Sequence, residues 1–289
     1  MCLEQLKTDM QHSRRAAYAQ STHQNLLVQW RSFLLFCLHY ELRPLPAETE
    51  TVALFAQFLS RSFKTVDSIF NYVSGVRIMH LYVGASPPNL SDFSFKLVLS
   101  GLRRLKPHRV SQAAPITPQI LVKMYPHICQ DPEGPTIWAL FLVAFYLFLR
   151  KSNLVPLTPT TFDPARQLSR GDVIIGENAV LVKIRWSKTI QFGQRVLKLP
   201  LLSVLGSVLC PVSAIKAMLE SVPTVKGGEP LFQIVDRGVR VPVTYLKYQF
   251  YVKKFADLVG EPAHRYSSHS FRRGGRILRF SLWCPKCAG

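Results

Sequence analysis

Hydrophobic residues in the first hundred positions recur every three or four residues, which is the period of an α-helix. In the first such segment Leu26, Trp30, Phe33 and Cys37 fall on one face, after a polar stretch over residues 1–20 that is expected to fray or to form a short basic helix. The same period predicts helices that start at Thr49 or Thr51, run from Val66 to Tyr82, and run from Asp92 to Lys106. Residues 1–106 are therefore predicted to form one all-helical domain.

A short linker and a second domain follow. The linker, residues 107–116, is basic at its start and then small and polar. Thr117 and Pro118 restart a helix, because Thr is a common N-cap and Pro suits the first helical position. Residues 136–149 are apolar on all sides, which predicts a helix at the centre of a second domain over residues 117–289.

The spacing then changes to that of strands. β-Branched and aromatic residues with turn residues between them predict three strands, over residues 172–175, 179–186 and 195–201. Helices are predicted again over residues 210–219 and 244–259. The lysines of the second of these helices are expected to face outward: Lys247, Lys253 and Lys254. The fold class is therefore mainly α with a small antiparallel β-sheet, or α+β.

Charge narrows the choice of partner. The 289 residues carry a formal net charge of +19, and both halves contain more Lys and Arg than Asp and Glu. A charge of this size favours a long polyanion as the partner. A ribosomal or tail-type protein of similar charge would be richer in Lys and poorer in aromatic residues, which make up 11% of this chain.

Cysteines and apolar runs indicate the compartment. The first four cysteines lie in apolar surroundings and are interpreted as buried, reduced thiols, which fits a reducing compartment. They are Cys2, Cys37, Cys129 and Cys210. The first thirty residues are polar and show no signal peptide. The longest apolar run, Ile137 to Leu149, is too short to span a bilayer.

Three places in the second domain could carry chemistry. His269 and Arg272 are three residues apart and fall on one face of a helical turn, which puts an acid/base group beside donors suited to a phosphate. The alternative is a helix start capped by Ser267 or Ser268, with a solvated basic turn and a glycine C-cap. Arg150 follows the apolar helix and is either a snorkelling helix end or a cation held for an anionic ligand. Lys188 sits at a strand end or turn and by itself is an ordinary exposed lysine.

Taken together, these pieces resemble the tyrosine recombinase (phage integrase) family, and most closely the recombinases of eukaryotic mobile elements. The runs Phe148-Leu149-Arg150-Lys151-Ser152-Asn153-Leu154 and Ser268-His269-Ser270-Phe271-Arg272-Arg273-Gly274-Gly275 carry the resemblance. It covers about residues 15–280. It implies a SAM-like helical core-binding domain followed by a catalytic domain, and the two domains would clamp double-stranded DNA. It also implies that the protein forms a homo-oligomer on DNA and acts in the nucleus.

The resemblance also implies a mechanism that uses no metal and no small-molecule cofactor. A tyrosine attacks the scissile phosphate, forms a 3′-phosphotyrosyl bond and releases a 5′-hydroxyl. Arg150 and Arg272 would bind the two non-bridging oxygens, where preorganised cations stabilise the developing charge. Lys188 would protonate the leaving oxygen, and His269 would act as a general acid/base or as a hydrogen-bond donor.

The chain departs from the family pattern in two ways. Asn153 stands where the family often has an acidic residue, and no tyrosine follows Arg272. Trp283 lies too close to the His-x-x-Arg box to take the family's tryptophan role, and Cys284-x-x-Cys287 is only half of a zinc site. We therefore expect a C-terminally truncated or altered chain that binds DNA without covalent cleavage. The alternatives are a non-catalytic domesticated or decayed DNA-binding protein and an unrelated basic RNA-binding protein.

Overall fold

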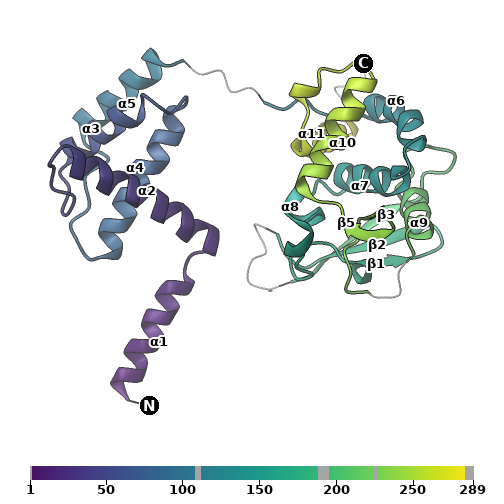
Figure 1. The fold of residues 1–289 in the computed structure, drawn as a ribbon, viewed down its shortest axis with the longest axis horizontal. Coiled ribbons are helices and arrows are strands. Elements are labelled where there is room, and N and C mark those ends of the chain that lie inside the picture. Colours follow the sequence, from purple (N-terminus) through teal and green to yellow (C-terminus); the bar gives the residue numbers. More distant parts are fainter. Residues whose placement is uncertain (1, 108–111, 188–194, 224–226, 284–289) are drawn as a thin grey trace. The chain divides into compact units, whose positions relative to one another are not determined.

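The computed structural model divides into two compact units, Met1–Val110 and Ser111–Gly289 (Figure 1). It describes residues 2–107, 112–187, 195–223 and 227–283, with side chains in the last helix up to residue 277. Each unit has its own hydrophobic core, and each is treated separately below. The predicted fold class, mainly helical with a small antiparallel sheet, is confirmed.

The first unit is all-helical. Its helices are α1 (Leu3–Ala16), α2 (Gln20–His39), α3 (Thr49–Leu59), α4 (Val66–Tyr82) and α5 (Phe93–Leu105). Thr65 and Asp92 cap α4 and α5, because each side chain accepts a hydrogen bond from a backbone N–H of the first turn. The core is built from all four helices α2 to α5, and Phe33, Phe55 and Phe95 are fully buried in it.

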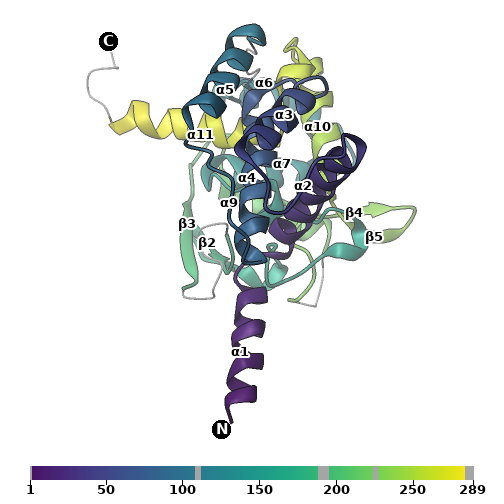
Figure 2. The same cartoon turned by 90° about the vertical axis from the view of Figure 1, so that its left-hand side faces the viewer.

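Helix α1 stands apart within this unit. It has no buried residue, and it extends away from the other four helices (Figure 2). Its last turn is held by a hydrogen bond of 2.8 Å between His23 Nε2 and the carbonyl oxygen of Arg15. The polar start of the chain is therefore a short basic helix, as one of the two expectations had it.

The second unit packs helices around one apolar helix. Its helices are α6 (Pro118–Cys129), α7 (Gly134–Tyr146), α8 (Lys151–Leu154), α9 (Pro211–Ser221), α10 (Tyr245–Leu258) and α11 (Ser268–Trp283), with short 3-10 turns η1 (Pro159–Thr161), η2 (Arg170–Asp172) and η3 (Ala263–Arg265). Every residue of α7 from Thr136 to Phe145 is buried, which confirms the predicted central helix. It ends at Tyr146, three residues before the predicted end, because Phe148 adopts a left-handed conformation with φ of 52°.

A three-stranded antiparallel sheet lies beside these helices. Its strands are β1 (Val173–Ile175), β2 (Ala179–Ile184) and β3 (Leu197–Leu202), in the order β1-β2-β3. In β2 the buried residues alternate with partly exposed ones, so one face of the sheet meets the core. A second hairpin, β4 (Gln233–Asp236) and β5 (Val239–Pro242), was not predicted. Its turn uses Arg237 and Gly238, both with positive φ.

Two expectations about side chains were wrong. Cys2 and Cys129 are exposed rather than buried, because Cys2 lies at the start of the projecting α1 and Cys129 at the outer end of α6. Lys247 and Lys254 are only partly exposed, because each forms an ion pair. They pair with Glu133 at 3.2 Å and with Asp131 at 2.5 Å, which ties α10 to the turn before α7.

Two kinds of site are absent from the described residues. None of the helices there combines the length and the apolar character needed to cross a membrane. In the same part of the chain, no three His, Cys, Asp or Glu side chains gather as a metal site would require.

Candidate active site

The start of α11 is shaped by a serine cap. The Ser267 hydroxyl accepts a hydrogen bond of 3.2 Å from the backbone N–H of His269, and the Ser267 N–H donates one of 3.0 Å to Ser270 Oγ. Phe271, fully buried, packs on Phe141 with ring centroids 4.7 Å apart. The cap and this anchor fix the turn that carries His269 and Arg272.

The two glycines after this turn lie inside α11, so they are not the C-cap that one interpretation expected. A Cβ on Gly274 would overlap the carbonyl oxygen of Ile116, and one on Gly275 would overlap the carbonyl oxygen of Phe145 and the Phe148 ring. The helix backbone therefore lies directly against the end of α7. This close approach brings the Arg272 turn to the segment that carries Arg150.

Arg150 occupies the corner between α7 and α8. The left-handed Phe148 turns the chain, and Arg150 is the N-cap residue of α8. Its side chain is half-buried, as is that of Arg272. Among the described residues, no carboxylate forms an ion pair with either arginine.

The close approach of Gly275 to Phe145 and Phe148 places the Arg272 turn near the segment that carries Arg150. Burial lowers the pKa of the Arg272 guanidinium, and the charges of Arg150 and Arg276 lower it further. Arg150 and the exposed Arg276 are thus near enough to act on Arg272, and none of the three forms an ion pair with a carboxylate of the described residues. An arrangement of this kind is suited to bind a phosphate, whose oxygens would neutralise the repulsion. Sequence reasoning missed Arg276, although its position four residues after Arg272 puts it on the same helix face.

The other two predicted site residues are less well defined. The His269 side chain is exposed, beside Arg272 on the first turn of α11. Lys188 lies outside the described residues, so the structure gives no position for it. Of the four predicted site residues, Arg150, His269 and Arg272 thus lie in the described part of the chain, and their shared role stays a prediction.

Asn153 joins α8 to the strand that precedes Lys188. It is almost fully buried, and its Nδ2 donates a hydrogen bond of 2.8 Å to the carbonyl oxygen of Trp186, just beyond β2. Its own carbonyl oxygen accepts a bond of 2.8 Å from the Leu168 N–H. The amide therefore positions the β2 end relative to Arg150, a task that an ionised carboxylate, having no donor, could not perform.

A contact that sequence reasoning missed lies on the other side of α8. Tyr245, the first residue of α10, donates its N–H to the carbonyl oxygen of Pro156 at 3.0 Å. Lys151 Nζ lies 4.7 Å from the centre of its ring. Burial raises the pKa of Tyr245, while a side-chain hydrogen bond with Ser152 lowers it in part. The start of α10 thus supports α8 next to Arg150, and no sequence signal linked these segments.

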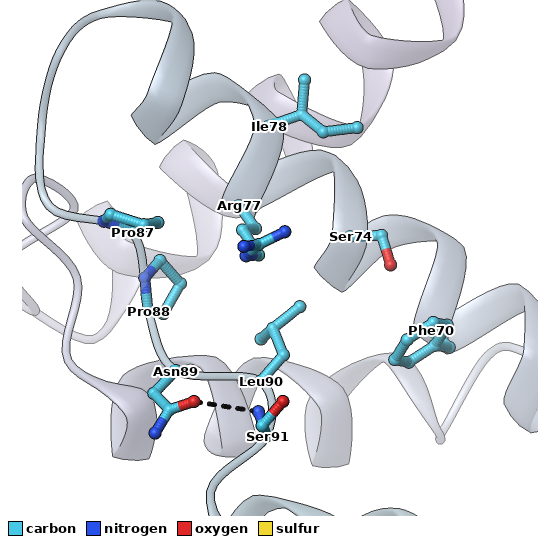
Figure 3. A pocket seen from close by; sticks show the side chains of 9 residues that line it. All are labelled: Phe70, Ser74, Arg77, Ile78, Pro87, Pro88, Asn89, Leu90 and Ser91. Atoms are coloured by element: carbon cyan, nitrogen blue, oxygen red, sulfur yellow. Dashed lines mark hydrogen bonds between the residues drawn. The ribbon is translucent and has the colours of Figure 1, made fainter.

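The helical unit has a cavity of its own, with a volume of about 530 Å³ and a lining of both apolar and polar residues (Figure 3). Arg77 and Ser74 of α4 face the loop that carries Asn89 and Ser91 across this space. The Asn89 side-chain oxygen is occupied by the Ser91 N–H at 3.0 Å. The Arg77 guanidinium has no ion-pair partner among the described residues, so a cation and hydroxyl groups line the opening.

Comparison with known proteins shows similarity to integrases. An integrase/recombinase described as a XerD homolog, from Selenomonas ruminantium, is 23% identical over 278 residues, which are 94% of this chain and 77% of that protein. The structure of the Tn1549 transposon integrase (residues 82–397), in complex with circular intermediate DNA, superposes with a TM-score of 0.55. It shares 16% identity and covers 96% of this chain and 87% of its own. No family model matches the chain. The integrase structure shows the fold of this chain.

Proposed function

We propose, on the premise that this chain has the fold of a tyrosine recombinase, that it binds duplex DNA and derives from an enzyme of DNA recombination and integration. The observation that carries the proposal is the close approach of α11 to the end of α7, which places the half-buried Arg272 near the half-buried Arg150. Among the described residues, no carboxylate forms an ion pair with either arginine. Unpaired cations at such a place are costly unless they serve an anion. A DNA phosphate is the anion that a chain of net charge +19 would meet.

The two guanidinium groups would hold the non-bridging oxygens of one phosphate. Each presents directed N–H donors, so the pair would fix the phosphate as well as neutralise it. His269 would lie beside the same phosphate and donate a hydrogen bond to it. Lys188, as the resemblance implies, would protonate a leaving 5′-oxygen, and Asn153 would position the strand that leads to it.

The resemblance implies a nucleophilic tyrosine that comes after Arg272 in the chain. No tyrosine follows Arg272 within these 289 residues. We therefore propose that this chain alone binds DNA without forming a phosphotyrosyl bond. Incubation with a nicked suicide duplex, followed by denaturing electrophoresis, tests this. We expect intact DNA and no covalent adduct, and an adduct that disappears when Arg150 is replaced by Ala would overturn the proposal.

The alternative is a non-catalytic, domesticated or decayed DNA-binding protein. The two functions differ in whether DNA binding needs both Arg150 and Arg272. A purely architectural protein would bind DNA equally well with only one of the two arginines. Supplying a tyrosine-containing C-terminal peptide from a related recombinase discriminates between them. Restored cleavage would favour an enzyme completed by another chain, and unchanged binding without cleavage would favour the non-catalytic protein.

The helical unit would contribute a second DNA contact at the Arg77 cavity. Replacing Arg77 by Ala should weaken binding to all sequences and reduce the salt dependence by about one ion, as loss of one phosphate contact does. Arg103 is the matched control, because it already faces Asp67 at 3.8 Å. Equal effects of the Arg77 and Arg103 substitutions on DNA binding would show that the cavity is not part of the DNA interface.

The remaining proposals concern context. We propose that the chain derives from a eukaryotic mobile element, acts in the nucleus and assembles on DNA as a homo-oligomer. The resemblance of the two motifs and the high positive charge support this. Microscopy of the tagged chain in eukaryotic cells tests the location, and exclusion from the nucleus would contradict it.

A further inference from the structure

Helix α1 carries an apolar stripe that nothing in its own unit covers. Leu3, Leu6 and Met10 recur at i, i+3 and i+7, so they lie on one face, and their exposed fractions are 66%, 46% and 47%. Only the last turn of α1 is tied to the rest of the unit, through His23. An isolated helix of 14 residues is marginal in water, so the first turns need a partner to be stable.

The same unit exposes an apolar groove. It has a volume of about 350 Å³ and lies between α2 and α3. Phe36, Tyr40, Leu54 and Phe58 form its walls, and Arg61 stands at its rim. Three of these rings form a cluster, with the centroid of Phe36 5.0 Å from Tyr40 and 5.3 Å from Phe58. Leu54 and Phe58 remain 48% and 41% exposed.

The stripe and the groove match in chemistry. An amphipathic helix that docks into a groove is recognised through anchors at i, i+3 and i+7, which is the spacing of the α1 stripe. Met10 is a flexible thioether that suits an aromatic-walled groove. Asp9 flanks the stripe and Arg61 borders the groove, and among the described residues neither side chain has an ion-pair partner.

We propose that α1 of one chain docks into the α2–α3 groove of a second copy of the chain, with Leu6 and Met10 as anchors and Asp9 beside Arg61. The structure argues against docking within one chain, because α1 leads away from its own four-helix core (Figure 2). The contact is independent of DNA and does not rest on the proposed function.

The test is sedimentation of the full chain without DNA over a range of concentrations. We expect reversible self-association of the unmodified chain. Leu6→Glu and Leu54→Glu should each weaken it about tenfold or more, because each puts a charge into the apolar contact. Thr8→Glu is the matched control, since it introduces the same charge on the opposite face of α1. Neither Leu6 nor Leu54 is buried, so the core should fold unchanged, which thermal unfolding checks.

A mixing experiment and a charge reversal within one chain identify the contact. An equal mixture of the Leu6→Glu and Leu54→Glu chains should regain part of the association, because the first keeps its groove and the second keeps its α1. Asp9→Arg should weaken association and Arg61→Asp in the same chain should restore it. A chain that stays monomeric, a Leu54→Glu chain that associates normally, or a mixture that regains nothing would overturn the proposal.

Discussion

Arg150 lies close enough to Arg272 for its charge to lower the pKa of the Arg272 guanidinium, although the two come from distant parts of the chain. Both side chains are half-buried, so solvent screens their repulsion only in part. The fold keeps them together through Gly275, which lets α11 touch the end of α7. Two like charges that the backbone holds near each other are better explained by ligand binding than by stability.

Neutralising Arg272 should therefore not destabilise the free protein. We expect Arg272→Gln to leave the free energy of unfolding unchanged or to raise it by about 0.2–0.5 kcal/mol, because like charges four residues apart on a helix repel. Phosphate should raise the melting temperature of the unmodified chain and have less effect on the variant. Thermal unfolding with and without phosphate measures both. A loss of more than about 1 kcal/mol in Arg272→Gln would identify the arginine as structural.

Gly275 should tolerate no side chain. Gly275→Ala would place a methyl group against the carbonyl oxygen of Phe145, and we expect a loss of about 1–3 kcal/mol in urea unfolding. Gly101→Ala is the matched control, because Gly101 lies within α5 and a Cβ there would meet nothing within 4 Å. That substitution should gain about 0.5–1 kcal/mol. Equal behaviour of the two variants would mean that α11 does not contact the end of α7.

Asn153 should be required as a hydrogen-bond donor. Asn153→Asp removes the donor to Trp186 when the carboxyl is ionised, whereas the protonated acid can still donate. The pKa of that carboxyl in the folded variant should be raised, so its contribution to stability is present below the unfolded pKa of about 4 and is lost as pH rises. The stability gap between unmodified and variant chains should thus widen from acid to neutral pH. A gap that narrows over this range would show that the site accepts a negative charge.

The Cys210 thiol should make the stability of the chain depend on pH in a second way. Burial raises the pKa of its thiol, but hydrogen bonds from Ser213, Val204 and Ser203 outweigh burial and lower it to about 6. Because the folded pKa is below the ordinary thiol value of 9.0, this stabilisation is complete above pH 9 and is lost as pH falls through 6. The stability of the unmodified chain relative to Cys210→Ser should accordingly increase between these values.

Cys37 provides the control for that experiment. Burial raises the pKa of its thiol to about 11, so the stability of the unmodified chain relative to Cys37→Ala should stay level and then fall toward alkaline pH. Urea unfolding at several pH values compares the two. A Cys210 difference that does not change with pH would show that the thiol stays protonated.

The sequence predicted those features that depend on neighbouring residues. Val66–Tyr82 was predicted with the bounds that the structure has, since apolar spacing and the Thr65 cap mark them locally. Thr117 and Pro118 likewise mark the start of α6. The His-x-x-Arg turn was recognised because its four residues are contiguous.

Features that depend on contacts between distant segments were missed. Asn153 donates a hydrogen bond to Trp186, and Tyr245 supports α8. Both interactions join segments whose sequences show no common pattern. The glycines of α11 were interpreted as a cap because a close backbone approach leaves no sequence signal other than glycine itself. Lys254 was expected to face solvent, since nothing nearby in sequence reveals Asp131 as its partner.

The most direct test of the account is equilibrium binding to duplex DNA at fixed salt by the unmodified chain, Arg150→Ala, Arg272→Ala and the double variant. If both arginines hold one phosphate, each single substitution should weaken binding about tenfold or more, and the double variant should bind only slightly less well than the weaker single variant. Thermal unfolding shows that each variant is folded. Full affinity in the double variant, or two losses that simply add, would contradict a shared phosphate site.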